Sequence, residues 1–250
     1  MEDPISDRRF GGLNRLYGPQ ALKRIQQVHI AVVGIGGVGS WAVEALARSG
    51  VMHITLIDMD HVAESNINRQ IHANSQTLGQ SKILAMQERV RLINPSCELH
   101  LIDDFLTPEN ASSLLNETLD LVIDATDQVS AKVAMAIWAK HHHKPLVMVG
   151  AAGGKKHAHR VEVTDLADAS HDPLLAQVRH GVRKAGIELT PKVSSGIYAV
   201  FSKEPVKRPE HLQSTSTNNS LNCHGYGSLV TVTATFGLSA AGWALNHFSE

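Results

Sequence analysis

The sequence contains very little cysteine, only Cys97 and Cys223 in 250 residues. Two cysteines cannot form the disulfide framework of a small secreted domain, and they cannot supply the paired Cys-x-x-Cys motifs of a structural zinc site. The opening residues, MEDPISDRRF, also lack the apolar core of a signal peptide. We therefore expect a protein of the reducing cytoplasm.

A strong excess of charge is missing as well, since the formal net charge is −1. The composition therefore gives no general attraction to nucleic acids or membranes. The charges are unevenly spread: residues 1–150 hold 13 basic and 16 acidic side chains, whereas residues 151–211 hold 10 and 7. This mildly basic second segment suits a polyanion, and an ordinary solvated surface explains it equally well.

Long apolar runs are rare. One extended apolar segment, residues 225–248, contains threonines, serines and glycines and lacks a basic flank. Its length is sufficient to cross a bilayer. Its polar residues favour a helix that is buried on a sheet or across a dimer interface, and a membrane span is the less favoured alternative.

Two kinds of apolar pattern alternate along the first 150 residues. Short β-branched runs predict strands, and segments with helical spacing predict helices between them. The strands are expected at 30–33, 54–57, 98–102, 119–123 and 146–149, and the helices at 19–27, 39–49, 81–92, 108–116 and 129–140. This alternation is typical of an α/β fold, a Rossmann-like doubly wound and mostly parallel sheet with helices on both faces and a small carboxyl-terminal extension.

Three regions are expected along the chain. Residues 1–27 form an amino-terminal arm and a short helix, and the arm itself shows no core pattern. Residues 28–163 form the nucleotide-binding domain, and residues 164–250 form the extension. Beyond residue 150 we expect short strands at 160–163 and 196–201, a helix at 172–185, an irregular mobile loop at about 203–224, and the final apolar helix.

A glycine-rich turn follows the first predicted strand, with glycines at Gly34, Gly36, Gly37 and Gly39. Glycines permit a tight turn and let backbone N–H groups approach phosphates, and the helix that follows presents unpaired donors at its amino end. The next strand ends in Asp58, an acid placed to accept hydrogen bonds from ribose hydroxyls. This pattern predicts a nucleotide site but does not distinguish ATP from a nicotinamide cofactor.

Polar side chains beyond this acid favour ATP. They lie where open α/β sheets bind ligands, at the carboxyl ends of the strands. The set comprises Asp60, Asn66, Asn68, Arg69, Gln70, Lys82 and Asp127. Arg69 and Lys82 are suited to phosphate oxygens, and Asp127 to Mg²⁺. Taken singly, Lys82 is equally a surface cation and Asp127 a helix cap, but together the residues favour a triphosphate with its metal.

The motifs GIGGVG, IDMD, SNINRQ, GQSK and DATD resemble the ubiquitin-activating superfamily of adenylating enzymes, which includes the bacterial ThiF and MoeB types. The resemblance covers residues 8–163 closely. It implies that a substrate carboxylate attacks the α-phosphate of ATP, giving an acyl-adenylate and pyrophosphate. Position by position, it implies that Asp58 binds ribose, that Asn66, Arg69 and Lys82 contact phosphates, and that Asp127 serves Mg²⁺.

The same resemblance implies a homodimer. In such enzymes an arginine from the amino-terminal arm of the partner subunit completes the site, and Arg9 and Arg15 are the candidates here. A monovalent cation is a further candidate ligand.

One branch of the superfamily matches over the whole length. The stretches RRFGGLNRLYG, TLIDMDHV, NRQIHA, VTDLADASHDPL and GYGSLVTVTATFG are similar to the enzymes that dehydrate threonylcarbamoyladenosine in tRNA next to the anticodon. The zinc cysteines of the ThiF and MoeB types are missing, and no catalytic cysteine stands in the middle region. The resemblance implies ATP-dependent cyclisation of the modified base. The alternatives are activation of a small sulfur-carrier protein on the same fold, and a nicotinamide-dependent oxidoreductase or nucleotide sensor.

The implied substrate makes tRNA the expected partner. Basic side chains of the second segment would meet its phosphates. They are Lys155, Lys156, Arg160, Arg179, Arg183 and Lys184. The branch is associated with a cysteine desulfurase system, so a sulfur acceptor is a candidate partner and Cys223 a candidate thiol, although a loop cysteine without a role is favoured. Cys97 is interpreted as a packing residue.

Overall fold

The computed structural model describes residues 4–206 and 226–250. Within this part of the chain the strands form one sheet in the order β3-β2-β1-β4-β5-β7-β6. Neighbouring strands are parallel except for the antiparallel pair β6 and β7. The strands are β1 (His29–Val33), β2 (His53–Ile57), β3 (Glu98–Ile102), β4 (Leu121–Asp124), β5 (Leu146–Val149), β6 (Val161–Asp165) and β7 (Ile197–Ser202). The predicted doubly wound α/β class is confirmed.

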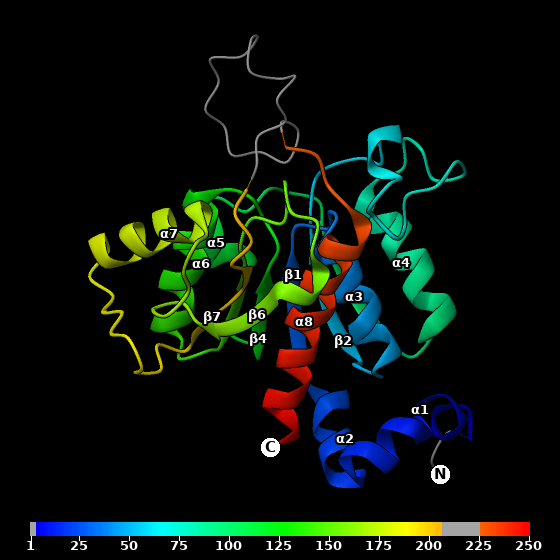
Figure 1. Cartoon of the computed structure of the whole chain (residues 1–250). Coiled ribbons are helices and arrows are strands. Elements are labelled where there is room, and N and C mark those ends of the chain that lie inside the picture. The colour runs from blue at the N-terminus through cyan, green and yellow to red at the C-terminus, as the bar shows by residue number, and fades with distance from the viewer. Residues whose placement is uncertain (1–3, 207–225) are drawn as a thin grey trace.

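Helices cover both faces of this sheet (Figure 1). The α-helices are α1 (Pro4–Tyr17), α2 (Pro19–Gln27), α3 (Gly39–Arg48), α4 (Lys82–Ile93), α5 (Ala111–Leu114), α6 (Val129–His141), α7 (Pro173–Lys184) and α8 (Val230–Ser249). Side chains of α2, α3, α4 and α8 pack on one face, and those of α5, α6 and α7 pack on the other.

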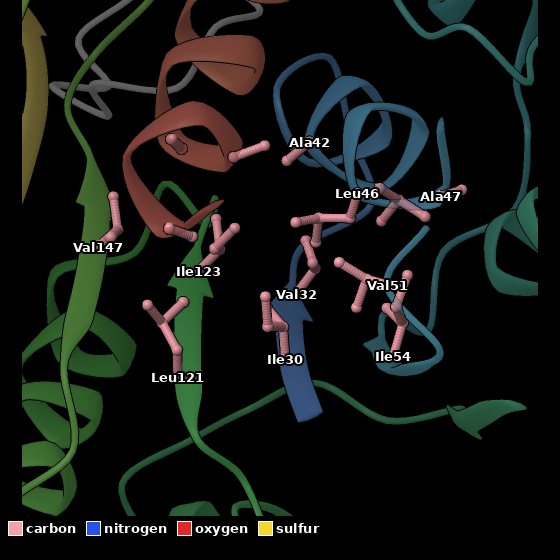
Figure 2. Packing of buried hydrophobic residues seen from close by; sticks show 14 of the residues in the cluster. Ile30, Val32, Ala42, Leu46, Ala47, Val51, Ile54, Leu121, Ile123 and Val147 are labelled. Carbon is pink, nitrogen blue, oxygen red and sulfur yellow. The ribbon is translucent and has the colours of Figure 1, made fainter. Parts of the chain in front are cut away.

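The alternation of side chains along the central strands builds these two cores. In β1, Ile30 and Val32 join the cluster beneath α3 and α8, whereas Ala31 and Val33 join the opposite cluster. Figure 2 shows the first cluster, in which Ile30 and Val32 lie below Leu46 of α3. Because successive side chains of a strand point to opposite faces, a continuous apolar run such as IAVV serves both cores.

The final apolar segment forms α8, which packs along α3 and over β5, β6 and β7. The contact with α3 is close because Gly237 has no side chain: a Cβ there would overlap the carbonyl oxygen of Val38. One face of α8 is thus buried on α3 and the sheet, as predicted, whereas Leu238 on the same helix is 47% exposed. Among the described residues, no helix has both the length and the apolar character that crossing a bilayer requires.

The amino-terminal arm differs from the prediction. It forms helix α1, and Phe10 is buried against Gly50. The spacing of Phe10, Leu13 and Tyr17 is helical, but Gly11 and Gly12 between them mask the signal because glycine disfavours helices.

Two further differences concern boundaries. The predicted helix at 108–116 is reduced to Ala111–Leu114, because the Asn110 side chain accepts a hydrogen bond from the Thr107 N–H and donates one to the Phe105 carbonyl, in competition with helix formation. The expected domain boundary at 163/164 falls inside β6, and β7 joins β5 to β6 in the same sheet. Of the predicted loop at 203–224, residues 207–224 lie outside the described residues.

Candidate active site

A cavity of about 490 Å³ lies at the carboxyl ends of β1, β2 and β4. The strand order reverses between β1 and β4, so the connections leave on opposite sides and open a crevice at this point. The volume is within the range of small-molecule sites, about 300–1,000 Å³. Its walls come from the glycine turn, the polar loop after β2, the loop after β4, residues 104–106 and the amino end of α8.

The glycine turn forms the floor of this cavity. Gly34 has a φ of 86°, and a Cβ there would lie 3.0 Å from the backbone of Ala125. A Cβ on Gly37 would press on the Arg69 side chain at 3.1 Å. Gly39 does not line the cavity; a Cβ there would overlap the carbonyl oxygen of Gly34, so this glycine allows α3 to pack on β1. Gly36 lines the floor with Gly34 and Gly37.

Asp58 lies at the end of β2 and is 6% exposed. Its carboxylate accepts hydrogen bonds from the backbone N–H groups of Ile35 and Asp60. Burial raises the pKa of Asp58, and the nearby Lys82 cation and these N–H groups oppose that shift. Each carboxylate oxygen has more than one acceptor site, so the group can still accept hydrogen bonds from a sugar.

Two cations reach the cavity from the loop after β2 and from α4. The Lys82 side chain is 7% exposed, and its Nζ lies 2.6 Å from Oδ2 of Asp60. The Arg69 guanidinium donates to the Ser65 carbonyl at 2.7 Å and to Oδ1 of Asn68 at 2.8 Å. Asp60 and these contacts hold both cations at the wall of the cavity, where each is placed to bind a phosphate oxygen.

Two buried polar atoms without a protein partner belong to residues that line this cavity. Oε1 of Gln70 and Oγ of Ser228 are buried, have no hydrogen-bond partner in the described structure, and belong to residues that line the cavity. Asn66 also lines it, with its Oδ1 committed to the Ala63 N–H. Asn68 does not line it; its amide donates to the Ser228 carbonyl and ties the polar loop to the residues just before α8. Unpaired buried groups are costly, and a polar ligand can satisfy them.

Asp127 lies on the loop after β4, is exposed, and completes the wall opposite Asp58. Among the described residues no group of three histidine, cysteine or carboxylate side chains could hold a metal by itself. Mg²⁺ commonly takes one or two carboxylates and completes its shell with phosphate oxygens and water. Asp127 therefore fits a metal that arrives with a nucleotide.

The comparison with known proteins identifies the family. The model of the ThiF family matches residues 11–250. The chain belongs to the ThiF family. A tRNA threonylcarbamoyladenosine dehydratase of Haemophilus influenzae is 47% identical over 236 residues, which cover 94% of this chain and 90% of that protein. One of Escherichia coli is 43% identical over 257 residues, which cover 98% and 96%. The crystal structure of E. coli tRNA N6-threonylcarbamoyladenosine dehydratase in complex with ATP matches with a TM-score of 0.89 and 42% identity, covering 99% of this chain and 96% of that one.

The two arm arginines of this ThiF-family protein lie away from the cavity of their own chain. Arg9 donates to the Leu92 and Ile93 carbonyls at the end of α4, where a cation suits the helix dipole. Arg15 is exposed on α1. In Figure 1, α1 lies at the opposite end of the molecule from the loop that follows β2. A role in catalysis therefore requires a second subunit, and it stays a prediction.

The six predicted tRNA-facing residues of the ThiF-family chain differ in exposure. Lys156, Arg160, Arg183 and Lys184 are exposed, and Arg179 is partly buried and donates to the Ala169 carbonyl.

The prediction that Lys155 faces tRNA is wrong, because the residue is buried. Its side chain is fully buried, donates to the Ser202 carbonyl at 2.8 Å and pairs with the buried Asp172 at 3.7 Å. Burial lowers its pKa, and Asp172 opposes that shift. A cation so enclosed cannot meet a phosphate backbone.

The sequence interpretation also missed a buried ion pair under the loop that carries Asp127. Lys132 of α6 lies 3.0 Å from Asp124 at the end of β4, and both side chains are fully buried. Oδ1 of Asp124 accepts hydrogen bonds from the N–H and hydroxyl of Thr126. A signal was present, because Lys132 occupies the apolar stripe that continues at Met135 and Ala136.

Proposed function

We propose that this protein dehydrates threonylcarbamoyladenosine in tRNA at the expense of ATP. The threonyl carboxylate attacks the α-phosphorus, pyrophosphate leaves, and an acyl-adenylate forms. A nitrogen or oxygen of the neighbouring carbamoyl group then attacks the acyl carbon and closes a ring, and AMP leaves with one carboxylate oxygen. The substrate thereby loses the elements of one water molecule.

One observation carries this proposal: Asp58, Arg69, Lys82 and Asp127 line a single cavity over the glycine turn in a chain whose whole length resembles the named dehydratases. Asp58 would hold the ribose, and Arg69 and Lys82 would neutralise phosphate oxygens. Pre-placed charges of this kind typically contribute a factor of about 10²–10³ each to turnover. Lys82 would exchange its contact with Asp60 for phosphate.

Magnesium belongs to the proposal as the metal that accompanies the nucleotide. Asp127 would bind it, and the ion would neutralise charge on the departing pyrophosphate. A monovalent cation is a second candidate ligand.

No protein nucleophile is required in this scheme. Among the described residues that line the cavity there is no cysteine. Cys97 lies elsewhere, and burial raises the pKa of its thiol to about 12, which keeps it protonated and unreactive. Cys223, the candidate thiol for a sulfur-acceptor partner, lies outside the described residues. The burial of Cys97 and its distance from the cavity lining favour intramolecular ring closure over thioester transfer through this residue.

We further propose a cytoplasmic homodimer that binds tRNA through exposed basic side chains. Arg9 and Arg15 would then reach the site of the partner subunit. Mixing an inactive Arg9→Ala or Arg15→Ala subunit with an inactive Lys82→Ala subunit should restore up to about one quarter of wild-type turnover, because half of the subunits pair as heterodimers and each has one intact site. Absence of any restoration would place the site within one chain.

The direct test is mass spectrometry of modified tRNA incubated with the protein, ATP and Mg²⁺. We expect the modified nucleoside to lose the mass of one water, with AMP and pyrophosphate formed in equal amounts. Unchanged tRNA would refute the function. The alternative, activation of a sulfur-carrier protein, predicts pyrophosphate exchange that requires a carrier with a free Gly-Gly end and ignores tRNA.

A further inference from the structure

A second cavity of about 110 Å³ adjoins the nucleotide cavity on the side of β5 and α7. The two share the wall formed by residues 125–127 together with Val38 and Ala152. Along the carboxyl edge of the sheet the order is therefore Asp58 on β2, the glycine turn on β1, Asp127 after β4, and then the second cavity. The second cavity thus lies across the phosphate region from the ribose acid.

The lining of this second cavity is mainly apolar. Val149, Ala152, Pro173 and Leu174 supply hydrocarbon surface, and all except Pro173 are at most 5% exposed. Thr126 adds a hydroxyl, which donates to Asp124 and keeps acceptor sites free. Asp127 and Tyr226 add further polar atoms, so the lining suits a small group that carries both apolar carbon and a polar atom.

The wall of this cavity is rigidly held by the buried Asp172. One oxygen of Asp172 accepts from the Leu175 N–H and caps α7, and the other accepts from the Ala151 N–H. Lys155 pairs with this carboxylate and fixes it to the Ser202 carbonyl of β7. A Cβ on Gly150 would overlap Asp172, so the loop after β5 lies tightly against the amino end of α7. The part of the wall that residues 150–151 and 173–174 form is therefore in place before any substrate binds.

We propose that this second cavity binds the threonyl side chain of the modified adenosine and makes the enzyme selective for threonine over smaller amino acids at that position. This inference rests on the proposed function. A carboxylate that attacks the α-phosphorus must approach beside the phosphates, and the second cavity adjoins them there. The volume of the second cavity, about 110 Å³, also agrees with this occupant. An apolar cavity of about 150 Å³ accepts benzene, and the threonyl side chain is smaller than benzene and needs less space.

Leu174 gives the test, because it lines the second cavity without lining the nucleotide cavity. Leu174→Phe fills the space, and Leu174→Ala removes the packing surface. Either change should lower kcat/KM for tRNA bearing threonylcarbamoyladenosine by about tenfold or more, because a methyl-sized mismatch in an apolar pocket has this effect. With the glycine analogue of the modification, which has no side chain to place, kcat/KM should change by less than about threefold.

The matched control is Ala176→Phe, which adds the same ring on an exposed position of α7. It should leave the threonine-to-glycine ratio unchanged. The dissociation constant for ATP without tRNA should stay within about twofold in every variant, since Leu174 does not touch the nucleotide cavity. Using both Leu174 variants covers the event that the larger side chain prevents folding, which circular dichroism would reveal.

The outcomes separate the two proposals. A wild-type protein that leaves threonylcarbamoyladenosine intact refutes the proposed function and this inference with it. An active wild-type protein whose Leu174 variants lose both substrates equally, or neither, refutes the side-chain pocket alone. Loss confined to the threonyl substrate supports both.

Discussion

Replacing Lys132 by methionine tests whether the buried ion pair supports the loop between the two cavities. The Nζ of Lys132 lies 3.0 Å from Oδ2 of Asp124 and donates to the Val149 carbonyl at 2.7 Å. Oδ1 of Asp124 in turn accepts the two hydrogen bonds of Thr126. Lys132→Met therefore leaves a buried carboxylate without its cation at the base of this loop.

The size of the effect follows from that burial. Breaking a buried pair by removing one partner costs about 3–5 kcal/mol, because the remaining charge has neither water nor a counter-ion. Adding Asp124→Asn removes this charge, and the amide oxygen still accepts from Thr126. The double variant then chiefly lacks a donor for the Val149 carbonyl, about 1–3 kcal/mol. We expect it to unfold with a free energy about 2 kcal/mol higher than that of Lys132→Met.

Urea unfolding followed by circular dichroism measures these differences, provided that the m-values agree among the variants. Lys140→Met is the control: Lys140 is exposed on the same helix and bonds the Ser195 carbonyl, so its replacement should change the free energy of unfolding by at most about 1 kcal/mol. A double variant no more stable than Lys132→Met would refute charge compensation as the role of the pair.

Three further predictions concern separate parts of the fold. Gly237→Ala should destabilise the protein by about 1–3 kcal/mol and weaken ATP binding, because the added methyl group pushes α8 off α3. Gly242 faces open space on the same helix, so Gly242→Ala should be neutral or stabilising by up to about 1 kcal/mol. Equal melting temperatures of the two variants would contradict this reasoning. Burial, with smaller effects of nearby cations, lowers the pKa of His72 to about 4 from 6.5. As the pH falls, the unfolded chain therefore binds a proton at this residue before the folded protein does. The contribution of His72 to the free energy of unfolding is complete above pH ~6.5 and falls by about 2 kcal/mol between pH 7.5 and 5. His72→Leu should flatten that part of a plot of unfolding free energy against pH, and an unchanged slope would remove His72 as the cause. Lys82→Ala and Asp127→Ala should each reduce turnover by about 10²-fold or more with the circular dichroism melting curve preserved, and a lost fold would mean that these groups are structural.

Local sequence patterns were sufficient to predict most strands and helices of the fold and most charged residues of the candidate site. Each strand and helix of the first 150 residues has its own apolar spacing, which depends only on neighbours in the sequence. Because parallel strands end at one edge, the polar residues after those strands could be grouped before their positions were known. For that reason the predicted Asp58, Arg69, Lys82 and Asp127 all line the observed cavity.

These local patterns could not predict contacts between segments that lie far apart in the sequence. Ser228, just before α8, and Thr233, in its first turn, line the same cavity, although almost 200 residues separate them from the glycine turn. No local spacing links two such segments. Only the packing of α8 on α3 brings them together, and that packing depends on the missing side chain of Gly237.

The sequence by itself determined the class of fold, the nucleotide cavity and its charged residues. These follow from short-range periodicity and from the fact that the carboxyl ends of parallel strands lie at one edge of the sheet. The tertiary structure alone decided which charges are buried. Lys155 is predicted from the sequence to face tRNA, and the apolar stripe around Lys132 does not reveal its partner. Each of these cations is fully enclosed because another element supplies its carboxylate or carbonyl partner. Burial of a charge is favourable only when such partners are present, and their presence is a property of the whole fold.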